Sequence, residues 1–288
     1  MDLFISQSLN GLVYGALLFL LASGLSLIFG LMGVVNLAHG SFFMLGAFVG
    51  LSVAKATGSF WLAMLLAPLP VAAIALLMEV LFLRPLYKRP KLDQVLLTFG
   101  FSFVFTDIVE SFWGKDTFSI SEPPALDDSI EFLGGFFPLY RLALLGFGLL
   151  AALVLWLIID RTRAGAMVRA GVDDSATAMG IGLNVPLLLT TTFTCGAALA
   201  GLAGVIAGPI LGVYSGVDVE VLIPAFIVIV VGGMGSLKGA FVGSVVIGMA
   251  DTFGKAYLPE TAMFLTYVAM ILILLARPGG LFGQAQPR

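Results

Sequence analysis

The chain has 288 residues, of which 60% are hydrophobic and 11% are charged, and its formal net charge is -3. Soluble domains carry about 25% charged residues, so this composition excludes an ordinary soluble protein. The mean hydropathy is +1.10, and several apolar runs reach the roughly 20 residues with which a helix crosses a bilayer. We therefore expect an all-α polytopic membrane protein.

The expected spans follow one another along the whole chain. Apolar segments cover residues 9–30, 36–54, 61–83 and 92–113, a polar loop covers 114–138, and further apolar segments cover 139–159, 186–210, 221–231, 237–253 and 261–276. The segment 221–231 is short for a full crossing, so it is either a half-helix or a re-entrant segment. We expect about eight to nine transmembrane or half-membrane helices in a single transmembrane domain, residues 1–288.

Lysines and arginines predict the orientation, because they gather in cytoplasmic loops. Three basic groups lie at 84–91, 161–169 and 277–288. An even number of expected crossings separates each group from the next, so all three can be cytoplasmic. The acidic loop 114–138 then lies outside, with the N-terminus outside and the C-terminus in the cytoplasm.

A polar segment, 161–185, separates the fifth and sixth spans and begins RTRAGAMVRAGVDDSATAMGIGLN. Asp173 or Asp174 can cap the N-terminus of a helix, and a glycine such as Gly180 or Gly182 can end it. We therefore expect a short cytoplasmic surface helix. Two roles stay open: docking on a soluble partner, or an ordinary positively charged loop that only fixes the topology.

Small residues recur every four positions in several expected spans. They are Gly46 and Gly50; Gly196, Ala200, Gly204 and Gly208; and Gly235, Gly239 and Gly243. Small residues at this spacing let helix backbones approach closely in lipid, so we expect close helix packing along these faces.

Polar residues also recur every four positions in the fourth span: Gln94, Thr98, Ser102, Thr106 and Glu110. Polar side chains inside spans are costly and often functional, so this stripe is a candidate lining of a transport pathway. Alternatively, its hydroxyls bond back to carbonyls of their own helix. Near the end of the third span, Glu79 precedes Arg84 by five residues, which favours a local ion pair.

The sequence predicts neither a catalytic nor a metal site. No GxxxxGK[ST] phosphate loop occurs. His39 and Ser41 are two residues apart, which places them on opposite sides of a helix and excludes a nucleophile–base dyad. His39 is also the only histidine, with too few ligands nearby to hold a metal.

Five motifs occur in the order found in LivH-type permeases of ABC importers for branched-chain amino acids. They are VNLAHGS, RPLYKRP, RAGVDDSATAMGIGLN, VGGMGSLKGAFVG and ARPGGLFG. The chain resembles this family over about residues 9–283. The resemblance implies a multi-pass subunit of the bacterial inner membrane that translocates branched-chain or other hydrophobic amino acids. Relatives that move urea, short amides or small carboxylic acids keep those solutes as alternatives.

The resemblance also implies the partners. They are a second, LivM-like permease, two cytoplasmic ATPase subunits and a periplasmic solute-binding protein. ATP and magnesium would be bound by the ATPases, so no cofactor is expected in this chain, and neither is a nucleic-acid partner. A self-sufficient channel or secondary carrier is the alternative of a different class.

Functional residues carry over by position. The resemblance implies an ATPase-coupling set of Arg169, Ala170, Asp173, Asp174, Ala178 and Gly182. Asn36 and His39 match the family's asparagine–alanine–histidine–glycine core, and Ser41 stands where many members have glutamate. With Gln94, Thr98 and Ser102 of the polar stripe, these three are the expected pathway residues. Glu79 and Arg84 match a glutamate followed by arginine–proline, an expected structural ion pair.

Overall fold

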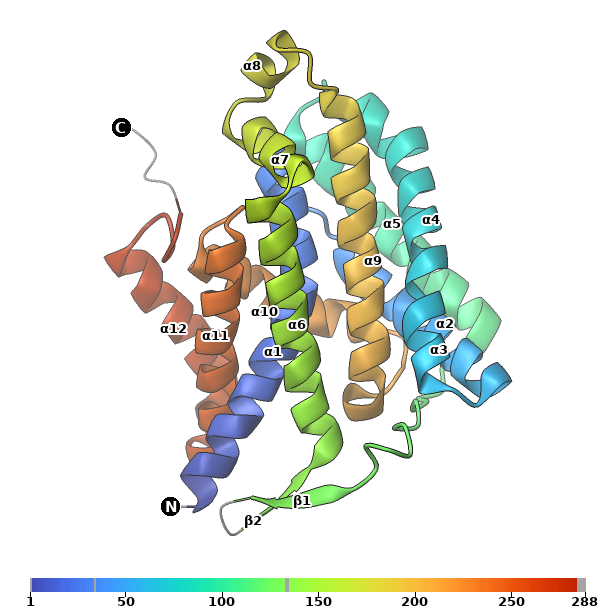
Figure 1. Ribbon diagram of the computed structural model, residues 1–288, viewed down its shortest axis with the longest axis vertical. Coiled ribbons are helices and arrows are strands. Elements are labelled where there is room, and N and C mark those ends of the chain that lie inside the picture. Colours follow the sequence, from blue (N-terminus) through green and yellow to red (C-terminus); the bar gives the residue numbers. More distant parts are fainter. Residues whose placement is uncertain (1, 34, 133–134, 284–288) are drawn as a thin grey trace. The chain divides into compact units, whose positions relative to one another are not determined.

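The computed structural model describes residues 2–33, 35–132 and 135–283, which are largely α-helical (Figure 1). The elements in chain order are α1 (Asp2–Met32), α2 (His39–Thr57), α3 (Phe60–Leu66), α4 (Pro68–Met78), a π-helix (Glu79–Leu83), a 3-10 helix (Arg84–Leu86), α5 (Lys91–Trp113), β1 (Ser129–Phe132), β2 (Gly135–Pro138), α6 (Leu139–Arg161), α7 (Arg163–Asp173), α8 (Ser175–Gly180), α9 (Val185–Leu211), α10 (Val217–Gly232), α11 (Leu237–Tyr257), a second 3-10 helix (Pro259–Thr261) and α12 (Ala262–Ala276).

Within the described residues, 6 helical segments are long and apolar enough to cross a membrane, or up to 7 with one bent pair. The pair is α10 and α11, bent by 119° at the GGMGS turn. A further apolar helix, Phe264–Ala276, is shorter. These findings confirm the all-α polytopic class. The expected total of eight to nine helices and the orientation of the termini stay predictions.

The third span is divided, although the sequence predicted one helix over 61–83. It runs through α3, α4, the π-helix and the 3-10 helix, together Phe60–Leu86. Pro68 is the first residue of α4, where its missing N–H would be unpaired in any case. Pro85 lies in the 3-10 helix and cannot donate to an α-helical ladder. The π-helix between them begins at Glu79.

The chain forms two compact units, each built from segments that are far apart in the sequence. Unit 1 comprises Met1–Ser23, Glu122–Leu153 and Ile223–Arg288, and unit 2 comprises Gly24–Ser121 and Val154–Leu222. All of the predicted site residues lie in unit 2.

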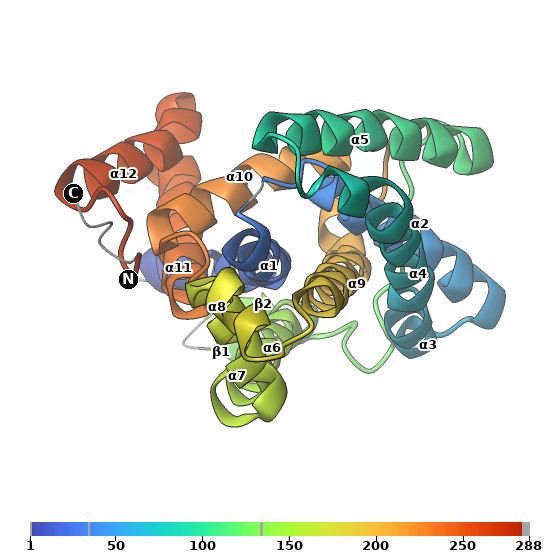
Figure 2. The same cartoon turned by 90° about the horizontal axis from the view of Figure 1, so that it is seen from above.

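In unit 2, α9 packs against α2 and α4, as Figure 2 shows. Glycines permit this approach. A Cβ atom added at Gly46 of α2 would overlap the carbonyl oxygen of Gly201 in α9, and one added at Gly204 would overlap that of Phe43. The predicted close packing is therefore confirmed at this helix pair.

In unit 1, the start of α1 lies against α11, where a Cβ atom added at Gly248 would crowd the backbone of Gly11 and Gly15. The segment after α12 also covers the end of α10. Leu281 N–H donates to the carbonyl of Val231 at 2.8 Å, and Phe282 N–H to that of Gly232 at 2.9 Å. These bonds satisfy carbonyls that a helix C-terminus otherwise leaves unpaired.

The loop 114–138 contains an antiparallel hairpin that the sequence reading did not predict. Strands β1 and β2 pair from Ser129↔Pro138 to Phe132↔Gly135. The hairpin leads directly into α6, because Leu139 N–H donates to the carbonyl of Asp128 at 2.8 Å.

Candidate functional site

The polar segment between α6 and α9 contains two helices where the sequence predicted one. Thr162 caps α7, accepting the N–H of Gly165 at 3.1 Å. The chain becomes extended at Asp174, whose carboxylate accepts the N–H groups of Ala176 and Thr177, each at 3.0 Å, to begin α8. The helix expected after the paired acids is therefore α8. Gly182 follows it with φ +91, which favours glycine.

The carboxylate of Asp174 is held in its charged form. The Thr177 hydroxyl donates to it at 2.6 Å, and together with the N–H of Thr177 this lowers the pKa of Asp174. Its neighbour Asp173 is the last residue of α7, and the side chain of Asp173 lies outside the described part of the structure. Ala170 ends α7 by accepting the N–H of Asp174.

Arg169 joins α7 to the end of α6. Its guanidinium donates to the carbonyl of Ile159 and lies 3.7 Å from Asp160 Oδ1. The turn between the two helices is tight, since a Cβ atom added at Gly165 would overlap the carbonyl of Ile159. Arg169 therefore holds the polar segment against the helix that precedes it.

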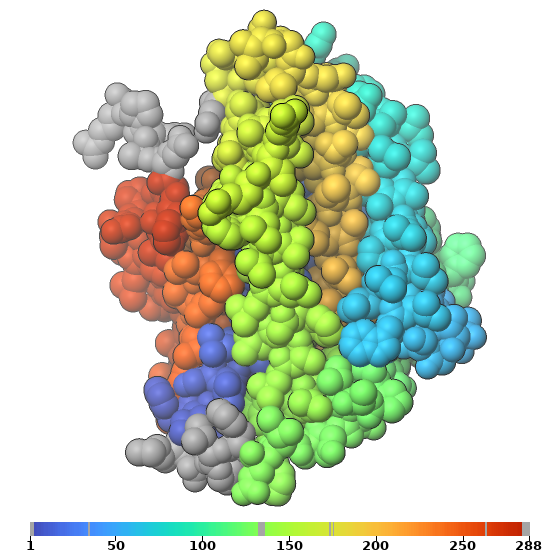
Figure 3. Space-filling model, in the orientation of Figure 1, coloured from blue at the N-terminus to red at the C-terminus, as the bar shows by residue number. Residues whose placement is uncertain are grey.

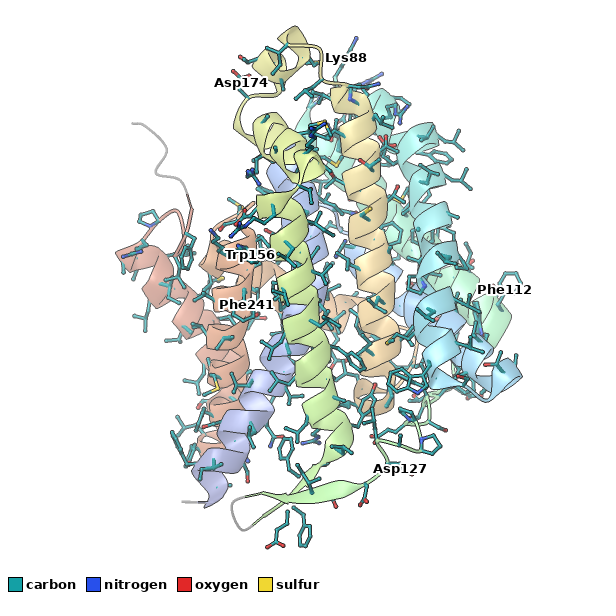
Figure 4. All side chains as sticks on the ribbon, in the orientation of Figure 1. Lys88, Phe112, Asp127, Trp156, Asp174 and Phe241 are labelled. Carbon is teal, nitrogen blue, oxygen red and sulfur yellow. The ribbon has the colours of Figure 1, made fainter. Side chains whose placement is uncertain are left out.

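Apolar side chains are exposed on α7 and α8 and directly after α8. Met179 is 52% exposed and Ile181 74% exposed, and Met167 and Val172 are also exposed. Ala178 is buried, so it anchors α8 while its neighbours face outward. The two helices lie at the end of unit 2 where α9 begins (Figure 3). Figure 4 shows Asp174 and Lys88 at that same end.

A buried hydrogen-bonded cluster joins the end of the third span to α9. Glu79 is 0% exposed and accepts Arg84 Nη2 at 3.2 Å and the Tyr87 hydroxyl at 2.5 Å. Arg84 Nη2 also lies 2.5 Å from Thr190 Oγ1 in the second turn of α9. Burial, reinforced by the Glu79 carboxylate, raises the pKa of Tyr87. The expected ion pair is thus part of a larger link between two spans.

A second buried polar cluster lies at the start of α2. Asn36 Oδ1 accepts the N–H of Ala38 at 3.1 Å, and Leu37 N–H donates to Thr98 Oγ1 of α5 at 3.1 Å. His39 is buried with its ring edge-on to Phe42. Two residues on, the Ser41 hydroxyl donates to Asp218 Oδ2 at 3.0 Å. The expected pathway residues Asn36, His39, Ser41 and Thr98 therefore gather in one place.

The family model described as "Branched-chain amino acid transport system / permease component" matches residues 7–274. The chain belongs to this permease family. It is 28% identical to the branched-chain amino acid permease protein LivH of Escherichia coli K12, over 98% of this chain and 96% of that protein. It is 29% identical to BraD of Pseudomonas aeruginosa, over 98% and 97%.

Two further similarities extend the comparison. The chain is 26% identical to the permease protein LivM of Escherichia coli K12, over 93% of this chain and 68% of that protein. Its fold is similar to a solved structure, PsaBC from Streptococcus pneumoniae in complex with Fab, with a TM-score of 0.51 at 14% identity, covering 95% of this chain and 92% of that one.

In this permease the polar residues of the α5 stripe differ in their burial. Gln94 and Thr98 are buried, and Gln94 donates to the carbonyl of Leu86 at 3.1 Å. The hydroxyls of Thr98, Ser102 and Thr106 bond back to carbonyls of their own helix, at 2.9, 2.6 and 2.9 Å, as the alternative expects. Gln94 and Thr98 thus lie in the interior of unit 2, and Thr98 also accepts the N–H of Leu37 at 3.1 Å.

Sequence reasoning missed Asp218, the buried acid of this permease's second cluster. It lies in the first turn of α10 and is 3% exposed. The only available signal was an acidic residue at the start of an apolar run, which is also typical of an ordinary helix N-terminus.

Proposed function

We propose that this chain is the membrane-spanning permease subunit of an ATP-driven importer for branched-chain or other hydrophobic amino acids. The observation that carries the proposal is the family match over residues 7–274. The exposed apolar face of α7 and α8 supports it, because a polar, two-helix segment between spans with exposed Met179 and Ile181 suits docking on a soluble subunit.

The proposed assembly contains two permeases, two ATPases and a periplasmic binding protein. LivH and LivM are both similar to this chain, which supports a pair of related permeases. The ATPases would bind ATP and magnesium. We place the protein in a bacterial inner membrane. The end of unit 2 that carries α7, α8 and Lys88 then faces the cytoplasm, in accord with its basic loops.

Energy would enter through α8. An ATPase that moves α8 also moves the start of α9, which follows it after four residues. From there the Thr190–Arg84–Glu79 link leads into the third span. At Gly46 and Gly204 the backbones of α2 and α9 meet directly, which would let the two helices shift against each other, while the Val205 side chain lies against Gly50. The coupling residues would act by fixing the shape of α7 and α8, the helices that the ATPase moves. They are Arg169, Ala170, Asp174, Ala178 and Gly182.

The binding protein would dock at the opposite end of unit 2. Loop residues are ordered there: Phe118 and Val213 form an antiparallel bridge, and Ser215 Oγ donates to Glu110 Oε1 at 2.7 Å. Tyr214 donates to Glu220, which raises the pKa of Tyr214 to about 12. An ordered loop suits repeated docking because less conformational entropy is lost on each encounter.

Reconstituted transport tests the proposal. The chain is assembled with a LivM-like permease, both ATPases and the binding protein in proteoliposomes, and uptake of labelled leucine, isoleucine, valine, urea and acetamide is measured. We expect ATP-dependent uptake of the branched amino acids. Uptake of urea or acetamide instead would overturn the solute class. Leucine flux through this chain without ATPases would overturn the ATP-driven mechanism.

A further inference from the structure

Asp218 is a buried carboxylate with one side-chain partner. Its Oδ2 atom accepts the Ser41 hydroxyl at 3.0 Å. Its Oδ1 atom is buried and has no hydrogen-bond partner among the described residues. Buried polar atoms in folded proteins are nearly always paired, so an unpaired carboxylate oxygen needs an explanation.

In the described part of the structure, Asp218 also has no positively charged side chain as an ion-pair partner. None of the ion pairs among the described residues includes it, whereas Glu79, the other fully buried acid, has Arg84 at 3.2 Å. The N-terminus of α10 offsets part of the charge, because a helix start carries free N–H groups and a partial positive charge. A buried carboxylate still costs several kilocalories unless a full positive charge or a proton joins it.

The carboxylate is held in place by the backbone around it. Gly40 lies directly against the first turn of α10, where a Cβ atom would overlap the carbonyl of Asp218. The Ser41 hydroxyl fixes Oδ2, and the backbone N–H groups of Asp218 and Val219 also face the carboxylate. Oδ1 has no partner at hydrogen-bond geometry among the described residues, which leaves it as the atom available to a ligand.

A buried hydrogen-bond donor without a partner lies in Asn36, at the start of the segment 36–41 that ends with Ser41. Asn36 is 2% exposed, and its Oδ1 atom is used by the N–H of Ala38, which assigns the other atom as nitrogen. That atom, Nδ2, has no hydrogen-bond partner among the described residues. The segment 36–41 therefore has an unsatisfied neutral donor, Asn36 Nδ2, at its start. At its end, Ser41 holds Asp218, whose Oδ1 is an unsatisfied anionic acceptor.

This pair of groups matches the two charged ends of an amino acid. We propose that Asp218, oriented by Ser41, binds the ammonium group of the transported amino acid, and that the amide of Asn36 donates to its carboxylate. An apolar side chain of the solute needs no polar partner, which accords with the apolar residues on the same helix turns. The proposal rests on the proposed function and names the point in the chain that recognises its solute class.

Asp218 and Asn36 are 3% and 2% exposed in the described conformation, so solute reaches them when the segments around them move, and the first turn of α10 is the segment we expect to move. Pro224 weakens the helix just after that turn, because it cannot donate to the carbonyl of Glu220. A turn that is pinned by Gly40 and Ser41 on one side and loosened by proline on the other is suited to opening and closing.

Asp218→Asn tests the proposal, because asparagine keeps the shape and mimics a protonated carboxyl but cannot pair with ammonium. The variant is assembled in the full importer in proteoliposomes. We expect its initial rate of leucine uptake to fall about tenfold or more, the loss expected when a charge-assisted hydrogen bond is removed. ATP hydrolysis stimulated by the loaded binding protein should stay within about twofold of wild type. Asp251→Asn, which removes an acid paired with Lys255 at 2.7 Å, is the matched control and should leave both rates unchanged.

Other outcomes are distinguishable. If wild type takes up no amino acid, the proposed function fails. If wild type transports leucine and Asp218→Asn does so equally well, the ammonium site is wrong. Parallel loss of uptake and ATP hydrolysis assigns Asp218 a structural role and overturns the site.

If the Asp218→Asn importer fails to assemble, Ser41→Ala is the deciding variant, because it keeps the carboxylate of Asp218. Its leucine uptake should fall about threefold, and unchanged uptake overturns the proposal. Leucine uptake is also compared in sodium and choline buffers. If wild type requires sodium and Asp218→Asn does not, Asp218 binds an inorganic cation, and the proposed ammonium site is overturned.

Discussion

Arg84 Nη2 of the third span lies 2.5 Å from Thr190 Oγ1 of α9, although the two residues are 106 positions apart in the sequence. The same guanidinium holds the buried carboxylate of Glu79 at 3.2 Å. Thr190 bonds in turn to the carbonyl of Pro186 at 2.9 Å, in the first turn of α9. One arginine therefore ties the break in the third span to α9, the helix that directly follows the polar segment 161–185.

The first prediction concerns stability. Arg84→Gln should lower the free energy of unfolding by about 3 kcal/mol, because it leaves the Glu79 carboxylate buried without a counter-charge. Thermal unfolding of the purified chain in detergent measures the change. Lys255→Gln breaks a pair whose lysine is largely exposed and should cost at most about 1 kcal/mol. Equal losses for the two variants would contradict a special role of the buried cluster.

The second prediction separates stability from coupling. Thr190→Val keeps the size of the side chain but removes the partner of Arg84, while the Glu79–Arg84 pair remains. We expect uptake per ATP hydrolysed to fall about threefold, with only a modest loss of thermal stability. Unchanged coupling would show that the link merely stabilises the fold. Thr191→Val is the control, because the Thr191 hydroxyl bonds within α9, to the carbonyl of Leu188 at 3.1 Å, and to no other described residue.

The third prediction is a pH dependence of α8. The hydrogen bonds from Thr177 lower the pKa of Asp174 in the folded chain, so the cap is at full strength above the unfolded pKa and is lost as the pH falls through the folded value. Amide hydrogen exchange of α8, corrected for its intrinsic rate, should therefore accelerate in acid. Asp174→Asn preserves capping without a titrating group and should remove this dependence. A variant that keeps the same profile would contradict the assignment.

The sequence predicts features that depend on local pattern. The Asp173–Asp174 pair and the later glycines predicted the helix α8, since a cap acts within three or four residues. Glycines spaced by four predicted the close approach of α2 and α9, since that spacing marks one face of a helix. The Glu79–Arg84 pair is also local, five positions apart. The hairpin could have been found as well, because the glycine pair in SIEFLGGFFP is a turn signal.

Long-range pairings could not be predicted in this way. Ser41 and Asp218 are 177 positions apart, and nothing in either segment specifies the other. Thr190 likewise carries no local sign that it bonds to Arg84. The polar stripe of α5 is a related case: its spacing is regular, yet Gln94 and Thr98 are buried while Ser102 is not, although the hydroxyls of Thr98 and Ser102 both bond back to their own helix. Burial by distant segments decides such cases.

The fourth prediction concerns docking on the ATPase. Reversing both acids, Asp173→Lys with Asp174→Lys, removes the cap of α8 and inverts the local charge, so ATP hydrolysis should no longer respond to loaded binding protein. Co-purification of the ATPase and its stimulated activity are both measured. The variant Asp174→Asn restores the cap and separates helix formation from charge. Retained assembly and coupling in the double reversal would mean that α8 only fixes topology.

The last prediction tests the glycine face between α2 and α9. Gly46→Ala should destabilise the chain by about 1–3 kcal/mol, because the new methyl group meets the backbone of Gly201 and the helices must separate. Gly100→Ala is the matched control: nothing lies within 4 Å of its Cβ position on α5, and alanine favours a helix over glycine by up to about 1 kcal/mol. The melting temperature should therefore fall for the first variant and stay level or rise for the second. Transport should follow the same order, since sliding of α9 against α2 requires close backbones. A Gly46→Ala importer with wild-type stability and uptake would contradict both the close packing and its proposed part in coupling.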